Sequence, residues 1–586
     1  MSLSLNKLQT VKIQDPRTAI NKNRVYGIYE GGSTISVKDY STTSYSDSNF
    51  IFSCPPPNPQ IIVSREIHLQ APITFTITGT APIGQYLLQP GCFGIRSFPL
   101  SSVMTSLIVT INTQSVSINM SDVIQPLMRY NNYQKDREFV YSVSPAMQDQ
   151  YTTYEEGLGS IRNPLGAYGD CYEMARGAYP YTSINNVLGA GPGVPVTATV
   201  SYLLTEAIFL SPFLWGGIDH NGFIGILTFD FNFNFGNLGN MVCCSTAGGS
   251  TITNVTGHFT SNPLLLFTYI TPKILKPIHH SYVYAYYEIQ RYPTVFSPVA
   301  PNQTVTIQSQ NIQLNSIPTS IVLLVRRQNS DQTFNTTDTF FRINNVQVNF
   351  ENQTNLLASA TELDLYNIAR DNGCSLSWEQ WHGTTNVFNN TSANGTTIGT
   401  VGSILKLKFG KDIGLNEIQS SGLLGTYQLQ VNISCTNTNQ TQTITPTFYI
   451  ITISEGTFTI TNNRSFTEIG VMTKKDILDS KNAPYIDYHM LKNVYGGDFL
   501  DDISRFGSMF WNGLKGVVSD IGNAVPNALN LAQQSIPNAL GLVSKVGPLI
   551  GVGEGEECGS GLIGDGVVGG RMIKRHQLRK KMHRRY

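Results

Sequence analysis

The chain has 586 residues, of which 41% are hydrophobic and 13% charged, and its 39 Lys+Arg balance its 39 Asp+Glu. Globular proteins average about 25% charged residues, so this composition excludes a coiled coil, a long-helix protein and a charge-rich disordered chain. Residues 571–586 hold eight basic residues and no acidic one, which leaves 31 basic against 39 acidic residues, a net charge of −8, in the rest. The length predicts about three or four domains, or fewer large β domains.

The cysteines and the N-terminus bear on the compartment of synthesis. The eight cysteines are scattered, without a CxxC pair or a zinc-site spacing, and we interpret them as isolated reduced thiols. The N-terminal sequence MSLSLNKLQTVKIQDP lacks the basic start and apolar run of a signal peptide, which indicates intracellular synthesis. N-x-S/T triplets are frequent, but a chain rich in Asn and Thr also produces them by chance, so glycosylation stays open. The chain has no uninterrupted apolar stretch of about 18 residues, the length of a transmembrane helix.

Alternation of apolar and polar residues dominates the chain up to about residue 464. β-branched and aromatic side chains prevail in these segments, and turn clusters rich in Gly, Pro, Asn and Ser separate them. Such alternation predicts strands with one buried face, and hence an all-β protein of the sandwich or barrel class. The predicted buried positions include Ile73, Phe75 and Ile77; Phe229, Phe231, Phe233 and Phe235; Val346, Val348 and Phe350; and Leu429, Val431 and Ile433.

Two short helices are predicted within this β-rich part. One covers residues 121–130, with Ser121 as its N-cap, and the other covers residues 360–371, where Leu363, Leu365 and Ile368 recur. Each helix follows a similar run of strand patterns.

These similar runs indicate an internal duplication with unequal loops. Ile111 and Ile343, each followed by Asn, occupy equivalent places, and the segment from Phe229 is echoed by the segment from Tyr427. A jelly roll needs about eight strands in two Greek keys, and each half of the chain is long enough for one. Two prolines between residues 271 and 277 mark the boundary between the halves.

Four regions follow from this organisation. Residues 1–26 form an N-terminal arm that extends from the body to tie neighbours or the inner surface. Residues 27–275 form the first jelly roll, whose long insertion at about residues 141–195 we interpret as a surface loop or tower. Residues 276–490 form the second jelly roll, and residues 491–586 form a C-terminal segment.

The C-terminal segment differs in character from the rest of the chain. Apolar residues recur there at helical spacing and predict an amphipathic helix, and a Gly-rich stretch at residues 551–570 and the basic tail follow. The helix either packs under the domains before a disordered end, or acts as a membrane-active or lattice-binding peptide. The residues of this stripe are Phe506, Phe510, Leu514, Val517 and Ile521.

Catalytic and metal-binding constellations are missing from the sequence. It contains no HExxH motif, no phosphate-binding P-loop and no GxSxG elbow at a strand-to-helix turn. The paired carboxylates are sequence neighbours, which is typical of solvated turns. Exposed tryptophans could form a glycan platform, but core packing is their more frequent role. We therefore predict no enzymatic activity, no cofactor and no metal.

Six short segments occur in order along the chain: YLLQPGCFGIRSFPLSSV from Tyr86, NPLG from Asn163, FLSPFLWGG from Phe209, TPKILKPI from Thr271, NIQLNSIP from Asn311 and NVYGGDF from Asn493. This ordered set resembles the major capsid proteins of Sputnik-type virophages and of related polinton-like viruses. This resemblance implies a double jelly roll, with two tandem eight-stranded jelly rolls, that forms a homotrimer and tiles an icosahedral capsid as pseudo-hexagonal, hexon-like capsomers. It also implies penton and minor capsid proteins as partners, the virion as the location, and synthesis in the host cytoplasm or a virus factory.

The predicted C-terminal helix, with Trp511 beside its stripe, resembles the membrane-disrupting segment of the adenovirus internal protein VI. Capsid precursors in this wider group are often trimmed by an adenovirus-type cysteine protease that prefers glycine around the cut. Two segments fit that pattern, with cuts between Val552 and Gly553 or between Asp565 and Gly566. Glycines beside the bond would let an extended chain enter a narrow protease cleft.

Either cut would free the basic tail. Its charges would bind packaged DNA without sequence preference, serve as a cofactor peptide for the protease, or simply solubilise the chain. The basic residues are Arg571, Lys574, Arg575, Arg579, Lys580, Lys581, Arg584 and Arg585.

We therefore predict a non-enzymatic major capsid protein whose function resides in its interfaces. An uncharged surface rich in Asn and Thr suits such contacts, because desolvating uncharged polar groups costs less than desolvating ions. A glycan-binding cell-surface or fibre β-sandwich protein is the alternative, which a signal peptide or paired cysteines would favour. A penton or minor capsid protein is a third possibility, against which the duplication argues.

Overall fold

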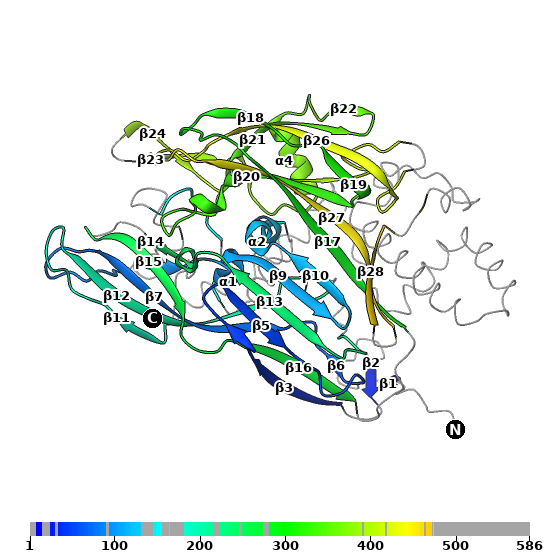
Figure 1. Ribbon diagram of the computed structural model, residues 1–586. Helices are drawn as coiled ribbons and strands as arrows, with labels where there is room; N and C mark the ends of the chain where they lie inside the picture. The colour runs from blue at the N-terminus through cyan, green and yellow to red at the C-terminus, as the bar shows by residue number, and fades with distance from the viewer. Residues whose placement is uncertain are drawn as a thin grey trace, which may run out of the picture. The chain divides into compact units, whose positions relative to one another are not determined.

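Strands predominate in the computed structural model, as the alternation predicted, and helices are few (Figure 1). The buried positions predicted on four strands all lie in the core. The described residues are 8–13, 24–29, 33–89, 93–130, 144–146, 148–154, 163, 181–214, 222–244, 249–272, 281–389, 392–416, 419–461, 464–470 and 473.

The first half of the chain forms a sandwich of two sheets. One sheet contains strands in the order β3-β16-β7-β12, and the other contains β5-β13-β9-β10. Phe229 and Phe231 of β13 meet Phe267 of β16 across the sandwich, with ring centroids 5.8 and 6.1 Å apart. The principal strands are β3 (Ser33–Ser41), β5 (Asn49–Ser53), β7 (His68–Thr80), β9 (Met104–Ile111), β10 (Gln114–Ile118), β12 (Pro195–Ala207), β13 (Phe229–Phe235) and β16 (Leu264–Pro272).

Shorter elements complete this sandwich. β11 extends the first sheet at β12, β15 pairs with β7, β6 pairs with β16, and β4 extends the second sheet at β5. β8 and β14 pair with each other, next to helix α1 and the 3₁₀ helix η5. Their bounds are β4 (Ser44–Tyr45), β6 (Ile62–Val63), β8 (Phe93–Ile95), α1 (Pro99–Val103), β11 (Ser183–Asn185), η5 (Leu238–Met241), β14 (Val242–Cys244) and β15 (Thr251–Phe259).

The second half forms another sandwich. One sheet has the order β17-β27-β20-β25, with β28 also paired to β27, and the other has the order β18-β26-β21-β22, with β19 also paired to β26. β23 (Thr384–Asn389) and β24 (Ser392–Gly399) form a separate antiparallel pair. The remaining strands are β17 (Ser281–Val295), β18 (Thr304–Gln308), β19 (Ile312–Ser316), β20 (Ser320–Arg327), β21 (Arg342–Phe350), β22 (Gln353–Leu356), β25 (Ile404–Lys408), β26 (Leu424–Thr436), β27 (Pro446–Thr461) and β28 (Arg464–Ile469).

Both sandwiches have the same strand order. When the eight principal strands of each half are numbered along the chain, with β18 and β19 together as the second strand of the second half, one sheet reads 1-8-3-6 and the other 2-7-4-5. All these pairings are antiparallel. Eight strands wound in this way form a jelly roll, so the chain is a double jelly roll, as the duplicated pattern and the resemblance predicted.

The helices also repeat. α2 (Met120–Arg129) lies between the fifth and sixth strands of the first jelly roll, and α4 (Glu362–Asp371) lies between the same strands of the second, followed by α5 (Trp378–His382). Both predicted helices are therefore present, within two residues of the predicted bounds. The prediction that Ser121 caps the first helix is wrong, because Asn119 is the N-cap residue and Ser121 lies buried inside the helix.

The duplication is real, but part of the predicted alignment is wrong. Phe229 and Tyr427 both lie on the seventh strand of their half, as predicted. Ile111 ends the fourth strand of the first half, whereas Ile343 is the second residue of the fourth strand of the second half. The two isoleucines thus lie at opposite ends of equivalent strands, because alternation identifies a strand and not the place of a residue within it.

The predicted boundaries can be compared with the strands. The boundary after residue 275 lies between β16 and β17, whereas the boundary after residue 26 falls inside β2. β1 (Leu8–Ile13) pairs with β2 (Arg24–Tyr29) in antiparallel register, a strand pair that we did not predict within the N-terminal arm. The C-terminal segment from residue 491 lies outside the described residues.

Candidate assembly surfaces

Helix α2 lies between the two jelly rolls (Figure 1), and nine of its ten residues are buried. Arg326 Nη1 of β20 donates to the Ser121 carbonyl at 3.1 Å, and Tyr449 Oη of β27 donates to Asp122 Oδ1 at 3.3 Å. Asp122 also forms an ion pair with Arg291 of β17. The sheet of the second jelly roll is thus covered on its outward side, and β20 is buried on both faces.

The residue after α2 continues this contact. The Tyr130 hydroxyl donates to the Ile404 carbonyl at 2.6 Å and accepts from the Lys406 amide at 2.8 Å. Both partners lie on β25, so the phenol satisfies two backbone groups at the edge of a sheet of the other jelly roll. Burial raises the pKa of Tyr130 well above its ordinary value, which keeps the hydroxyl protonated and able to donate.

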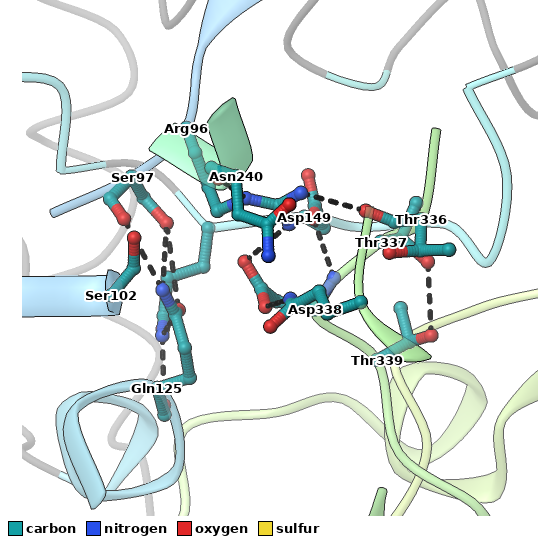
Figure 2. A network of polar contacts seen from close by, with 12 residues as sticks. Arg96, Ser97, Ser102, Gln125, Asp149, Asn240, Thr336, Thr337, Asp338 and Thr339 are labelled. Atoms are coloured by element: carbon teal, nitrogen blue, oxygen red, sulfur yellow. Dashed lines mark hydrogen bonds and ion pairs between the residues drawn. The ribbon is translucent and has the colours of Figure 1, made fainter. Parts of the chain in front are cut away.

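A buried ion pair joins the two jelly rolls (Figure 2). Arg96 Nη1 of the first lies 2.9 Å from Asp338 Oδ2 of the second, and both side chains are at most 2% exposed. The remaining Arg96 donors reach the carbonyls of Asn240 at 2.7 Å, Thr336 at 2.9 Å and Thr333 at 3.2 Å. Each of the three guanidinium nitrogens therefore donates to an acceptor, which a buried charge requires.

Asp338 stays ionised in this setting. Burial alone would raise the pKa of its carboxyl, but Arg96 and Arg326 outweigh burial and hold the pKa below its ordinary value. Gln332 Nε2 donates to Asp338 Oδ1 at 2.6 Å. The Asp338 amide in turn donates to Asp149 Oδ2 at 2.8 Å. A second acidic residue, which belongs to the first jelly roll, therefore joins the network.

Residues 148–154, which include Asp149, form hydrogen bonds with the second jelly roll. The Thr152 carbonyl accepts from Thr337 Oγ1 at 3.0 Å and from Asn439 Nδ2 at 3.1 Å. The Thr152 amide donates to the Gly399 carbonyl at 3.1 Å. We predicted a surface loop here, which is wrong for these residues: they are mostly buried because the other jelly roll supplies their backbone partners.

The 1-8-3-6 sheet of the first jelly roll has an open outward face. Its strands β7, β12 and β16 contain one Asp, Glu, Lys or Arg among them, Glu206, which points into the core. The outward positions instead form hydroxyl pairs, such as Thr74 with Ser201 at 2.7 Å and Thr78 with Thr197 at 3.3 Å. The part of the face that β7, β12 and β16 form is therefore uncharged and can be desolvated at low cost, whereas the edge strand β3 carries Lys38 and Asp39.

Comparison with known proteins decides which family has this architecture. The family model for the first domain of the Sputnik virophage major capsid protein matches residues 6–269, and the model for the C-terminal domain of major capsid protein V20 matches residues 289–456. The putative capsid protein V20 of Sputnik virophage is 32% identical over 609 residues, which cover 99% of this chain and 100% of that protein. The chain belongs to the Sputnik virophage major capsid protein family.

Solved structures agree with this assignment. The Sputnik virophage cryo-EM structure matches 85% of this virophage capsid protein and 100% of the solved chain, at 32% identity and a TM-score of 0.71. The crystal structure of the mavirus major capsid protein matches 83% and 100%, at 13% identity and a TM-score of 0.62, which supports the fold alone.

The predicted family, fold and function are thereby confirmed. The protein is a major capsid protein of the virophage type, located in the virion capsid, and it is a structural protein and not an enzyme. As a capsid component it associates with itself. The alternative of a glycan-binding β-sandwich protein does not fit this family.

The residue-level predictions for this capsid protein fall mostly outside the described residues. The two cleavage segments, the membrane-active helix and the basic tail all lie beyond residue 473. Cys54, Cys374 and Cys435 are buried free thiols, as predicted, and Cys243 and Cys244 are also buried.

Other side chains considered in the sequence have structural roles. Trp381 is fully buried, and its Nε1 donates to the Ile404 carbonyl at 2.9 Å, as expected of a core tryptophan. Asn439, one of the N-x-S/T sites, is only 4% exposed and contacts Thr152, so the folded chain offers no room for a glycan there. Within the described ranges, no three His, Cys, Asp or Glu side chains gather as metal ligands. No helix among those residues is long and apolar enough to span a bilayer.

Sequence reasoning missed the residues that join the jelly rolls. Arg96 and Asp338 each stand alone as a charge within an uncharged stretch, GCFGIRSFPL and TFNTTDTFF. In a chain with so few charges, an isolated charge between buried strands was the available signal. Nothing in the sequence, however, pairs residues that are 242 positions apart.

Proposed function

We propose that this capsid protein forms a homotrimer that acts as a pseudo-hexagonal capsomer of the icosahedral shell. The supporting observation is the repeated strand order 1-8-3-6 and 2-7-4-5 in two jelly rolls that a buried polar network joins. Three such chains would present six similar sandwiches around a threefold axis. A closed ring of identical head-to-tail contacts is a common way to build a symmetric oligomer.

The mass of the purified full-length protein tests the trimer. Light scattering after size exclusion, at two salt concentrations, should give a species near three times 64.5 kDa. The mass should change little with salt if the contacts are as uncharged as the exposed sheet. A stable 64.5 kDa monomer at every concentration would contradict the capsomer.

The proposal also includes further capsid proteins as partners and a proteolytic maturation step. Penton and minor capsid proteins would complete the shell, and a viral cysteine protease would cut after Val552 or Asp565 in chains made in the host cytoplasm or a virus factory. Intact-mass spectrometry of the capsid protein from purified particles tests the cleavage. A C-terminus at either residue supports maturation, and a mass that includes Tyr586 in every particle argues against it.

The C-terminal segment would bind DNA or membrane before or instead of cleavage. Eight basic residues in residues 571–586 would give nonspecific DNA binding that weakens steeply as salt rises. We expect the full chain to bind duplex DNA more tightly than a variant with these residues changed to Gln. Equal affinity and equal salt dependence would assign the tail to solubility.

A further inference from the structure

The contact between α2 and the second jelly roll has a topological counterpart that the described residues of one chain leave open. α2 lies between the fifth and sixth strands of the first jelly roll and covers the third and eighth strands of the second, β20 and β27. α4 occupies the same place in the second jelly roll. The third and eighth strands of the first jelly roll are β7 and β16, whose outward residues stay partly exposed, whereas β20 is buried on both faces.

The open face has the chemistry of a surface that becomes covered. Ile35 and Val37 on β3 are 68% and 69% exposed, and Leu203 on β12 is 37% exposed. By register, Ile35 lies beside Ile270 of β16, so apolar side chains line the edge of the same face. Exposed apolar residues on a long edge strand favour association with another chain unless something covers them.

Helix α4 also has an uncovered side. Only Leu365 and Ala369 of its ten residues are buried, in contrast to nine residues of α2. Leu363, Asn367 and Arg370 follow each other at helical spacing on another side of the helix, and Leu363 is 54% exposed. Arg370 at the end of this stripe is 58% exposed and lies 3.6 Å from Asp371 of the same helix.

One residue on each surface would supply a charge for an ion pair between chains. Asp39, in register with Leu266 of β16, lies on the same outward face as Ile35 and Val37 and is exposed. The in-chain contact likewise joins a helix to a first strand by an ion pair, between Asp122 of α2 and Arg291 of β17. Between chains the signs would be reversed, with Arg370 on the helix and Asp39 on the strand.

We propose that the outward face of the β3-β16-β7-β12 sheet binds the Leu363, Asn367 and Arg370 side of α4 from a second copy of this chain. This inference rests on the proposed capsomer and names the surfaces that hold it together. Each chain then offers one sheet and one helix, so the contact is head-to-tail and can close into a ring. The internal repeat supplies the argument for the partner, since the same kind of helix already covers the same kind of sheet within one chain.

Two variants of the full-length protein test the contact. Leu363→Asp places a charge on the helix stripe but suits the first turn of a helix, and Thr268→Arg places a charge on the open sheet face, at the outward position of β16 in register with Val37. Each variant alone should remain a 64.5 kDa monomer at concentrations where the wild type assembles. Asp230→Arg, at an exposed position on β13 of the other sheet, is the matched control and should assemble like the wild type.

Mixing the two variants distinguishes a head-to-tail contact from a symmetric one. The Leu363→Asp chain keeps an intact sheet, and the Thr268→Arg chain keeps an intact helix, so one good contact can form between them. The ring cannot close, and the expected product has a mass near twice 64.5 kDa. A mixture that stays monomeric would contradict the head-to-tail arrangement.

The remaining outcomes are also decisive. If either variant assembles like the wild type, α4 and this sheet do not hold the capsomer, although the capsomer itself stands. If the wild type never assembles, the proposed function fails. Circular dichroism and thermal unfolding check that the variants fold. Arg370→Asp and Asp39→Arg, both at exposed positions, give a charge-reversal test: each alone should weaken assembly, and the two combined in one chain should restore it.

Discussion

Arg96 of the first jelly roll and Asp338 of the second form a 2.9 Å ion pair in which neither side chain is more than 2% exposed. Breaking a buried pair by removing one partner leaves the other charge uncompensated. We expect Arg96→Met to lower the free energy of unfolding by about 3–5 kcal/mol. Arg326, 3.8 Å from Asp338, is the one further cation that contacts this carboxylate among the described residues and compensates only in part.

A double-variant cycle isolates the pair. Arg96→Met combined with Asp338→Leu removes both charges, and replacing a buried pair by apolar groups is much less costly than orphaning one member. Urea unfolding of the full chain measures all four proteins. A double variant less stable than the sum of the single effects would contradict this account of the pair.

The Tyr130 hydroxyl makes a second testable link between the jelly rolls. Tyr130→Phe preserves the ring but leaves the Lys406 amide without its 2.8 Å acceptor, whereas the Ile404 carbonyl keeps the Trp381 donor. An unsatisfied buried donor costs about 1–3 kcal/mol, so urea unfolding should show a loss in this range. Tyr45→Phe, at a residue 40% exposed, is the control and should change stability by less than about 0.5 kcal/mol.

Substitutions at two glycines of the second jelly roll distinguish the stability cost of backbone strain from the cost of a steric clash. Gly402 and Gly422 have positive φ angles of 92° and 84°. A Cβ on Gly402 would lie 1.9 Å from the Phe340 carbonyl oxygen, whereas a Cβ on Gly422 would meet nothing within 4 Å. We expect Gly422→Ala to cost about 1 kcal/mol from the left-handed conformation alone.

Gly402→Ala must in addition move the backbone that carries Phe340, so we expect a loss several times larger, seen as a drop in melting temperature or as insoluble protein. Thermal unfolding of both variants side by side measures the difference. Equal melting temperatures would show that the loop around Gly402 relaxes without cost.

Local patterns predicted most of the strands because their burial repeats every two residues. Val346, Val348 and Phe350 alternate inward along β21, as predicted. β20 is different: its residues are buried on both faces because α2 covers the outward side, so alternation could not place it in the strand order. The covering helix comes from another part of the chain, which no local pattern reports.

The sequence predicted the chemical type of the assembly surfaces but not the residues that form them. A low charge content predicted uncharged contacts, and the sheet around Thr76 is of that type. The contact of Asp149 with Asp338 joins a loop of one jelly roll to a loop of the other, and each residue alone looks like a solvated turn. Burial of these charges follows from tertiary packing, which a single sequence without strand register does not specify.

Glu206 gives the fold a pH dependence of unusual sign. Its carboxylate lies in the core and accepts hydrogen bonds from the Leu100 amide at 2.7 Å, the Ser101 amide at 3.0 Å and Ser101 Oγ at 2.8 Å. Burial raises the pKa of Glu206 from 4.5 to about 7, although these three donors act in the opposite direction.

Between pH 4.5 and 7 the folded state therefore binds more protons at Glu206 than the unfolded state, and its contribution to the free energy of unfolding falls as pH rises. Over the whole window this loss is about 3 kcal/mol. Glu206→Gln does not titrate and should lack this slope, even if its amide fits the donors at Ser101 less well. Urea unfolding of both proteins from pH 4.5 to 7.5 should thus show that the wild type loses stability relative to the variant as pH rises. A difference that stays constant across the range would show that Glu206 is ionised throughout, held by its three donors.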